Sequence, residues 1–193
     1  MDVNLAKIRH ERSKRDFPGV KLEDDEYVEY AFTRAKVCLW LILGGTGLGL
    51  IVILLGFLLT LLGQSMVDEM GRHFLFIILG TLLVAAIIIG LVSLMVYRGN
   101  RMIVTNKHVI QMIMNSPVST SINIIDLGSI EDASFRQENL LQKLFNYGTL
   151  RLSTVGDETT YTFPYSDVSS EELKGVTQLI TEAKKITKKA EKK

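Results

Sequence analysis

Two long apolar runs, Val37 to Val67 and Phe74 to Tyr97, constrain this chain most, because neither contains an Asp, Glu, Lys or Arg. A helix needs about 20 apolar residues to cross the hydrocarbon core of a bilayer. A charged side chain at the centre of such a helix would cost roughly 2.5–3.5 kcal/mol on insertion scales. The sequence therefore predicts two transmembrane helices, residues 37–63 and 74–97, joined by a short external loop at residues 64–73.

The rest of the chain divides into a cytoplasmic N-terminal arm, residues 1–36, and a C-terminal part from residue 98 that is long enough for one small core. The arm begins with a highly charged segment, residues 2–16, which predicts a flexible or interfacial structure. Further along the arm, Val28 to Phe32 alternates like a strand but equally suits an extension of the first span. The single cysteine, Cys38, excludes an intramolecular disulfide.

The distribution of basic residues predicts how the spans are oriented. Lys and Arg within about 15–20 residues of a span mark its cytoplasmic end. The loop between the spans holds Arg72 as its one basic residue, whereas several flank the other ends of the spans: Lys21, Arg34, Lys36, Arg98, Arg101 and Lys107. We therefore expect both termini in the cytoplasm.

Small residues recur along one face of each predicted span, and they allow helix backbones to approach closely. At 100° per residue the faces contain Gly45, Gly49 and Gly56 in the first span and Ala86, Gly90 and Ser93 in the second. Two interpretations remain open: the spans pack on each other through these faces, or the Gly45-xxx-Gly49 pair forms a face that dimerises with a second copy. Neither span carries an ionisable residue of the kind usual in ion or proton pathways.

From residue 98 the pattern changes to short strand-like segments separated by turn residues, which is typical of an antiparallel sheet or barrel. Asn139 to Phe145 predicts one or two helical turns. Ser169 and Glu172 form the signature of a capping box at the start of a C-terminal helix, whose apolar stripe is Leu173, Val176, Ile180 and Ala183. The predicted strands are residues 102–104, 108–114, 119–127, 130–135, 149–155 and 159–165.

Several segments in this order resemble the bacterial PH-like (pleckstrin-homology-like) domain of YdbS-type membrane proteins. They read RMIVTNKHVIQM, INIIDLGSIEDASFRQ and LFNYGTLRLSTV, after an upstream FPGVKLEDDEYVEYAFTRAK. The resemblance covers residues 17–182. It implies an α+β fold, a cytoplasmic PH-like β-barrel of about seven strands at residues 98–182 capped by a C-terminal helix. The whole chain would then be a membrane α-helical hairpin carrying this barrel on the bacterial cytoplasmic membrane.

Charge on the predicted domain argues against recognition of a polyanionic headgroup. Residues 98–183 hold 7 Lys and Arg against 10 Asp and Glu, a net charge of −3. Arg98 and Arg101 are expected to contact the membrane surface beside the second span. The tail, residues 183–193, is a second candidate contact through Lys184, Lys185, Lys188, Lys189, Lys192 and Lys193. These lysines either bind an anionic leaflet, at about 1 kcal/mol each, or complement the dipole of a solvated helix end.

Nothing in the sequence predicts catalysis, a cofactor or a metal. The three histidines lie in separate segments, and there is no Gly-x-Ser-x-Gly elbow. The acidic run Glu23 to Glu26 is expected to be solvated, and His108 to be a surface or turn residue. We therefore predict a non-enzymatic module for protein–protein assembly, with the bilayer, an unidentified protein and a second copy as partners, and without nucleic acid. A sensor of anionic lipid surfaces through the lysine tail is the alternative, and an accessory subunit of a transporter is a third.

Overall fold

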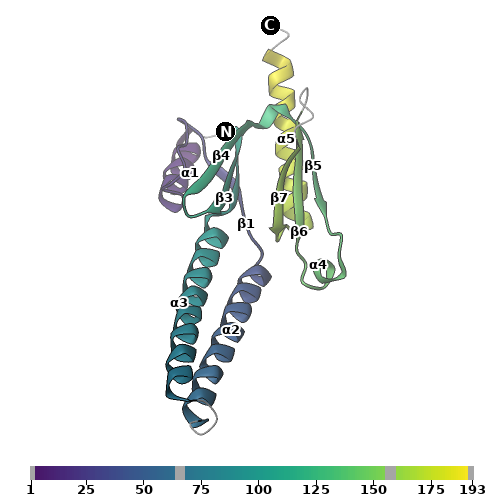
Figure 1. The fold of residues 1–193 in the computed structure, drawn as a ribbon. Helices are drawn as coiled ribbons and strands as arrows, with labels where there is room; N and C mark the ends of the chain where they lie inside the picture. Colours follow the sequence, from purple (N-terminus) through teal and green to yellow (C-terminus); the bar gives the residue numbers. More distant parts are fainter. Residues whose placement is uncertain (1–2, 64–67, 155–159, 191–193) are drawn as a thin grey trace. The chain divides into compact units, whose positions relative to one another are not determined.

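The computed structural model describes residues 3–63, 68–154 and 160–190, and the chain forms two compact units (Figure 1). One unit, Lys36–Arg98, contains two helices and is called the helical hairpin below. The other unit joins Met1–Ala35 with Gly99–Lys193 and contains all the strands, so it is called the sheet unit.

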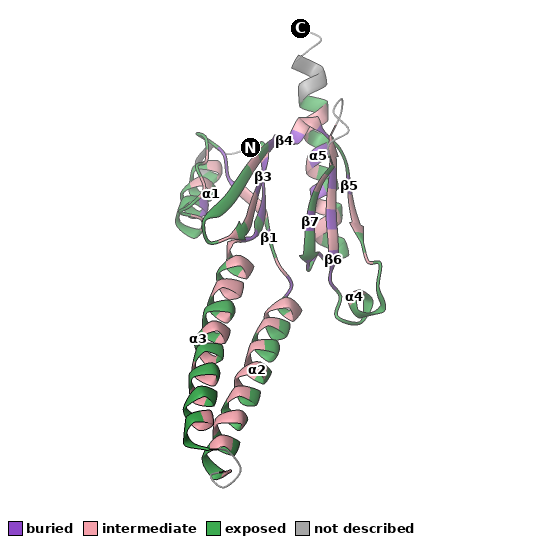
Figure 2. Ribbon diagram, in the orientation of Figure 1, coloured by how far each residue is buried: buried purple, intermediate pink, exposed green. Residues whose placement is uncertain are grey.

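The hairpin consists of α2, Lys36–Leu62, and α3, Glu69–Gly99, and both are long and apolar enough to cross a membrane. Neither helix contains a buried residue, as the absence of purple along them in Figure 2 shows. Helix α3 starts at Glu69 and not at residue 74, because Asp68 caps it. The Asp68 carboxylate accepts from the Gly71 amide at 3.3 Å, and the main-chain carbonyl of Asp68 accepts from the Arg72 amide at 3.0 Å.

Close approach of α2 to α3 occurs at two of the small residues. A Cβ at Gly56 would lie 3.0 Å from a Leu79 methyl, and a Cβ at Gly90 would lie 3.2 Å from the Thr46 methyl. A Cβ at Gly45 or at Gly49 would meet nothing within 4 Å. The contacts therefore run through Gly56 and Gly90, while Gly45 and Gly49 stay open. Ala86 and Ser93 are half-buried.

The described residues of the sheet unit form seven strands in two antiparallel sheets. The first sheet has the order β1 (Val28–Thr33), β2 (Arg101–Thr105), β3 (His108–Ser116), β4 (Ser119–Asp126). The second has the order β5 (Ile130–Arg136), β6 (Gly148–Thr154), β7 (Thr160–Ser166). The helical elements of this unit are α1 (Val3–Asp16), the 3-10 turn η1 (Leu127–Ser129), α4 (Leu140–Leu144) and α5 (Ser170–Ala190).

The N-terminal arm is part of this unit and not a separate flexible segment. Its first residues form α1, and the segment that suited either strand or helix is the strand β1. β1 pairs antiparallel with β2, where Phe32 lies opposite Met102. Because Phe32 is buried in the core, the arm supplies part of the core as well as an outer strand.

One hydrophobic core joins both sheets to α5. It contains Met102 from the first sheet, Phe163 from the second and Val176 from α5, each buried. The buried Gln111 of β3 also links the sheets, because its amide donates to the Thr162 carbonyl at 2.8 Å. The described strands pair in two sheets, which an isolated bridge between Arg34 and Ser166 connects, and this pairing does not show the expected closed barrel.

The predicted capping box at the start of α5 is confirmed. The Ser169 amide donates to the Glu172 carboxylate at 2.8 Å, and the Glu172 amide donates to the Ser169 hydroxyl at 3.2 Å. Val176 and Ile180 of the predicted stripe are buried against the core. Because α5 continues to Ala190, the expected tail at residues 183–193 begins inside this helix.

Candidate functional site

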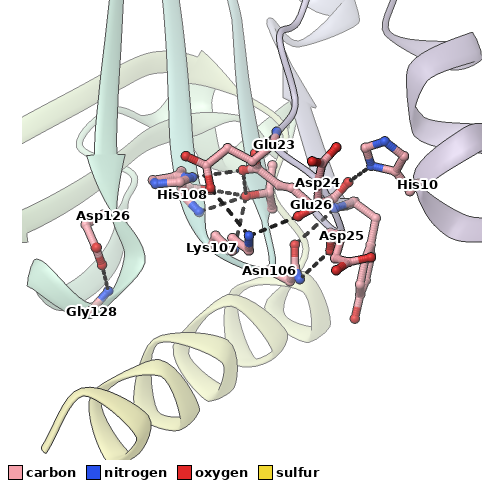
Figure 3. A network of polar contacts seen from close by, with 12 residues as sticks. His10, Glu23, Asp24, Asp25, Glu26, Asn106, Lys107, His108, Asp126 and Gly128 are labelled. Carbon is pink, nitrogen blue, oxygen red and sulfur yellow. Dashed lines mark hydrogen bonds and ion pairs between the residues drawn. The ribbon is translucent and has the colours of Figure 1, made fainter. Parts of the chain in front are cut away.

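The acidic run of the arm is docked on the turn between β2 and β3 (Figure 3). The Asn106 side chain accepts from the Tyr27 amide at 3.0 Å and donates to the Asp25 carbonyl at 3.2 Å. Lys107 donates to the Asp24 carbonyl at 3.1 Å and pairs with the Glu23 carboxylate at 3.4 Å. This turn therefore holds the arm through both main-chain and side-chain contacts.

Glu26 is the buried centre of the site, with 1% of its surface exposed. Its carboxylate accepts from the Thr105 hydroxyl at 2.6 Å and from the Glu23 amide at 2.8 Å, and it lies 3.0 Å from His108 Nδ1. Burial raises the pKa of Glu26, but these hydrogen bonds and the proximity of His108 outweigh burial and hold the pKa below its ordinary value. Glu26 is therefore a satisfied, ionised group.

This arrangement corrects the expectation that the whole acidic run is solvated: Glu23, Asp24 and Asp25 are exposed, but Glu26 is not. Two of the three histidines also meet here, since His10 Nδ1 lies 2.5 Å from the Glu26 carbonyl oxygen. In the described part of the chain no three His, Cys, Asp or Glu residues are arranged to hold a metal ion. This geometry is suited to holding the arm against the first sheet.

Helix α1 is held beside β1 mainly by polar contacts. Arg9 pairs with Glu29 at 3.3 Å, and its guanidinium lies 5.3 Å from the centre of the Tyr27 ring. The Ser13 hydroxyl accepts from the Val28 amide at 3.0 Å. A groove of about 520 Å³ is lined by residues of α1, the arm and the C-terminal half of α5, among them Arg9, Tyr27, Leu179, Glu182 and Ile186.

The predicted membrane-surface residues lie in different parts of the sheet unit and at the end of α3. Arg98 ends the apolar helix and Arg101 begins β2, and both are exposed. Lys184 donates to the Glu131 carbonyl at 2.9 Å, so this lysine binds the start of β5, while Lys185 is exposed. Lys188 and Lys189 lie in α5 beyond its described side chains, and Lys192 and Lys193 lie outside the described residues.

One edge of the first sheet is open. β4 is the last strand in the sheet order, and no described strand pairs with its outer edge. Ile122 and Ile124 of this strand are exposed, although alternate apolar side chains in a strand usually face a core. Alternation in the sequence predicts this strand, but the exposure of its isoleucine side chains depends on which strands flank it.

The chain resembles known proteins mainly at the level of a family. A family model described as "Bacterial PH domain" matches residues 38–183. Among solved structures, a DUF1696 family protein with a pleckstrin-homology domain from Shewanella loihica PV-4 matches with 13% sequence identity and a TM-score of 0.33. That match covers 44% of this chain and 70% of the other chain. No curated protein matches.

Proposed function

The chain belongs to the bacterial PH domain family, and from this premise we propose that it is a membrane-tethered, non-enzymatic assembly module. Its architecture would be that of YdbS-type proteins, with two spans followed by a PH-like domain. The spans hold the domain at the inner face of the bacterial cytoplasmic membrane, with both termini in the cytoplasm. The domain then recruits protein partners, including a second copy of the chain.

The tether is supported by the length and composition of α2 and α3 and by short connections to the sheet unit. β1 ends at Thr33 and α2 begins at Lys36, while α3 ends at Gly99 and β2 begins at Arg101. A domain with such short connections stays close to the surface that the helices enter. The basic residues beside these connections favour a cytoplasmic location.

The open edge of β4 is the observation that carries the assembly function. An edge strand presents unpaired N–H and C=O groups to any incoming strand, and proteins usually block such edges with Lys, Pro or a bulge. Ser119–Asp126 contains no Lys, Arg or Pro and exposes Ile122 and Ile124. This edge suits antiparallel pairing with a strand whose side chains are also apolar, such as β4 of a second copy.

Energy transfer between two differently labelled copies in liposomes tests this assembly. We expect transfer in the full-length protein that falls in Ile122→Lys, because a charge on the edge opposes pairing. Ile186→Lys is the matched control, since Ile186 is also exposed but lies on α5. Equal transfer in Ile122→Lys and in the unchanged protein would exclude β4 as the interface.

A second set of variants distinguishes association through the β4 edge from association through the glycine face of α2. Gly45→Ile and Gly49→Ile change the open face of α2, because a Cβ at either position meets nothing within 4 Å. These substitutions would reduce transfer between copies if the Gly45-xxx-Gly49 face dimerises. Unchanged transfer in both variants assigns the association to the sheet unit.

Cysteine accessibility in intact cells tests the orientation. In a Cys38→Ser background, Met70→Cys would react with a membrane-impermeant maleimide from outside, because Met70 lies at the exposed start of α3. Ile186→Cys would react after permeabilisation alone. Labelling of Ile186→Cys in intact cells would reverse the proposed topology.

A further inference from the structure

The connection between β5 and β6 exposes a cluster of large apolar side chains, here called the apolar tip. Its members are α4 residues Leu140, Leu141 and Leu144 and the following Phe145, with exposures of 86%, 60%, 76% and 53%. Surface apolar residues on a monomer are normally scattered singly, and a contiguous group marks an interaction site. Figure 2 shows α4 as exposed.

The polarity of this short helix is partly inverted: of its two polar residues, Gln142 points into the loop, whereas Lys143 is exposed like the leucines. The Gln142 side chain accepts from the Glu138 amide at 2.5 Å and from the Asn139 amide at 3.3 Å. Gln142 is thus half-buried, whereas the leucines on either side of it point outward. A loop that needed only to be soluble would place its leucines inward and its glutamine outward.

Further contacts hold the apolar tip in this inverted arrangement. The Gln137 side chain donates to the carbonyls of Gln142 and Tyr147, at 3.3 Å each. The Tyr147 amide donates to the Gln142 carbonyl at 2.9 Å. At the base of the loop, a Cβ at Gly148 would collide with the Arg136 carbonyl, so glycine permits the close approach of β5 and β6 there. The leucines are therefore presented on a fixed scaffold.

The apolar tip lies at the end of the sheet unit where the chain leaves for α2. Gly148, which follows the tip, pairs with Ser166 of β7, and Arg34 bridges the same serine. The Ala35 amide donates to the Tyr165 carbonyl at 2.6 Å, and the Tyr165 ring stacks on Tyr147 with 6.2 Å between centroids. Helix α2 begins at the next residue, Lys36. Two stacked rings and three backbone contacts therefore connect the tip to Arg34 and Ala35, the last residues of the sheet unit before the first apolar helix.

We propose that the apolar tip is a second membrane contact, which inserts its leucines and Phe145 into the leaflet that α2 enters. This inference rests on the membrane tether of the proposed function. Apolar side chains of interfacial helices reach about 5–10 Å into the boundary between headgroups and acyl chains. A bilayer is favoured over a protein as the occupant because the tip is connected, within the sheet unit, to Ala35, the residue after which the chain continues into an apolar helix. The contact would fix the orientation of the sheet unit on the membrane.

Quenching of a fluorophore by nitroxide-labelled lipids tests this contact in the full-length protein. In a Cys38→Ser background, Leu141→Cys carries the fluorophore, and the protein is reconstituted in phosphatidylcholine–phosphatidylglycerol liposomes. Ile186→Cys is the matched control, because Ile186 is also an exposed apolar residue but lies on α5, near Lys184 and the start of β5. We expect a blue-shifted emission and lipid quenching at position 141 and neither at position 186.

A third label, Leu54→Cys in the middle of α2, separates the two proposals. Quenching at 54 without quenching at 141 would overturn the membrane contact and leave the tether standing. Absence of quenching at 54 would overturn the tether itself. Because lipid nitroxides report contact with lipid and not with protein, a blue shift at 141 without quenching would assign the tip to a protein interface and also overturn the proposal.

Discussion

The two ends of the sheet unit, which can be located in Figure 1, differ in the polarity of their side chains. At one end the arm buries Glu26 against the β2–β3 turn, and Lys184 binds the start of β5. At the other end, where the chain leaves for α2, the apolar tip exposes Leu140 and its neighbours. Seven residues of β5 separate the ends by roughly 20 Å at about 3.3 Å per residue.

This difference teaches that composition alone does not predict where in the unit a candidate membrane-contact residue lies. The lysines of the tail have the charge expected of a contact with an anionic leaflet, but the first of them, Lys184, is bonded to the start of β5, at the opposite end of the sheet unit from Ala35. The apolar tip has a composition common in ordinary cores, yet it is exposed at the end of the unit that contains Ala35. Our proposal therefore rests on position relative to the point where the chain leaves the unit.

The largest expected effect comes from the core that connects the two ends. Phe163→Ala removes a fully buried ring between the sheets and should lower the free energy of unfolding by about 3–5 kcal/mol. Thermal unfolding of the purified protein in detergent measures the loss. Thr162→Ala on the same strand, whose side chain is exposed, is the control and should change the free energy of unfolding by less than about 0.5 kcal/mol. Separate unfolding of the two ends would contradict a single core.

Loss of the buried carboxylate should affect the arm end next. Glu26→Gln removes the charge that accepts from Thr105 and contacts His108, and we expect a loss of about 1–3 kcal/mol in the free energy of unfolding. Glu23→Gln changes an exposed carboxylate of the same run and is the control. Equal effects of the two substitutions would show that burial of Glu26 contributes nothing.

The same residue predicts a dependence of stability on pH. The pKa of Glu26 in the folded state is lower than the ordinary value of 4.5, so its contribution is fully present above pH 4.5. The contribution is lost as the pH falls through the folded-state pKa, because the unfolded chain then binds the proton more strongly. Unfolding should be measured between about pH 3 and about pH 6, the range in which a carboxyl group titrates. Over this range we expect acid to destabilise Glu26→Gln less than it destabilises the unchanged protein. If the free energy of unfolding depended on pH in the same way in both proteins, the lowered folded-state pKa of Glu26 would be contradicted.

A smaller effect is expected at the start of α5, near the end of the unit that carries the apolar tip. Ser169→Ala removes the hydroxyl that accepts from the Glu172 amide and should cost about 1 kcal/mol. Ser170→Ala, one residue further along, is the matched control. An equal cost in the two variants would show that the capping box does not stabilise the helix.

The smallest effect is expected for the lysines of the far end. Charge reversal by Lys188→Glu with Lys189→Glu should leave the lipid quenching at a label on Ile186→Cys unchanged, because Lys184 of the same helix binds the start of β5, at the opposite end of the sheet unit from Ala35. The measurement uses anionic liposomes at low salt, where attraction to the leaflet is strongest. Quenching that disappears on charge reversal would establish the lysine tail as a membrane contact and reverse the comparison between the ends.

Several elements follow from the sequence because their signals are local. The two apolar helices are visible in the composition of long windows, and the strands from β2 to β7 follow from alternation between turn residues. The capping box of α5 is encoded within four residues. Even so, β7 departs from its pattern, because Tyr165 adopts a left-handed φ of 59° and points outward while Ser166 is buried.

The sequence by itself thus determined the order and type of most elements, and the tertiary structure decided which side chains are buried. Glu26 is buried because the arm folds back onto Thr105, 79 positions away, and no local pattern distinguishes it from the three acidic residues before it. The apolar tip is exposed because Gln142 takes the inner position of its loop. Periodicity reports contacts within one helix turn or hairpin, whereas burial depends on segments that meet only when the chain folds.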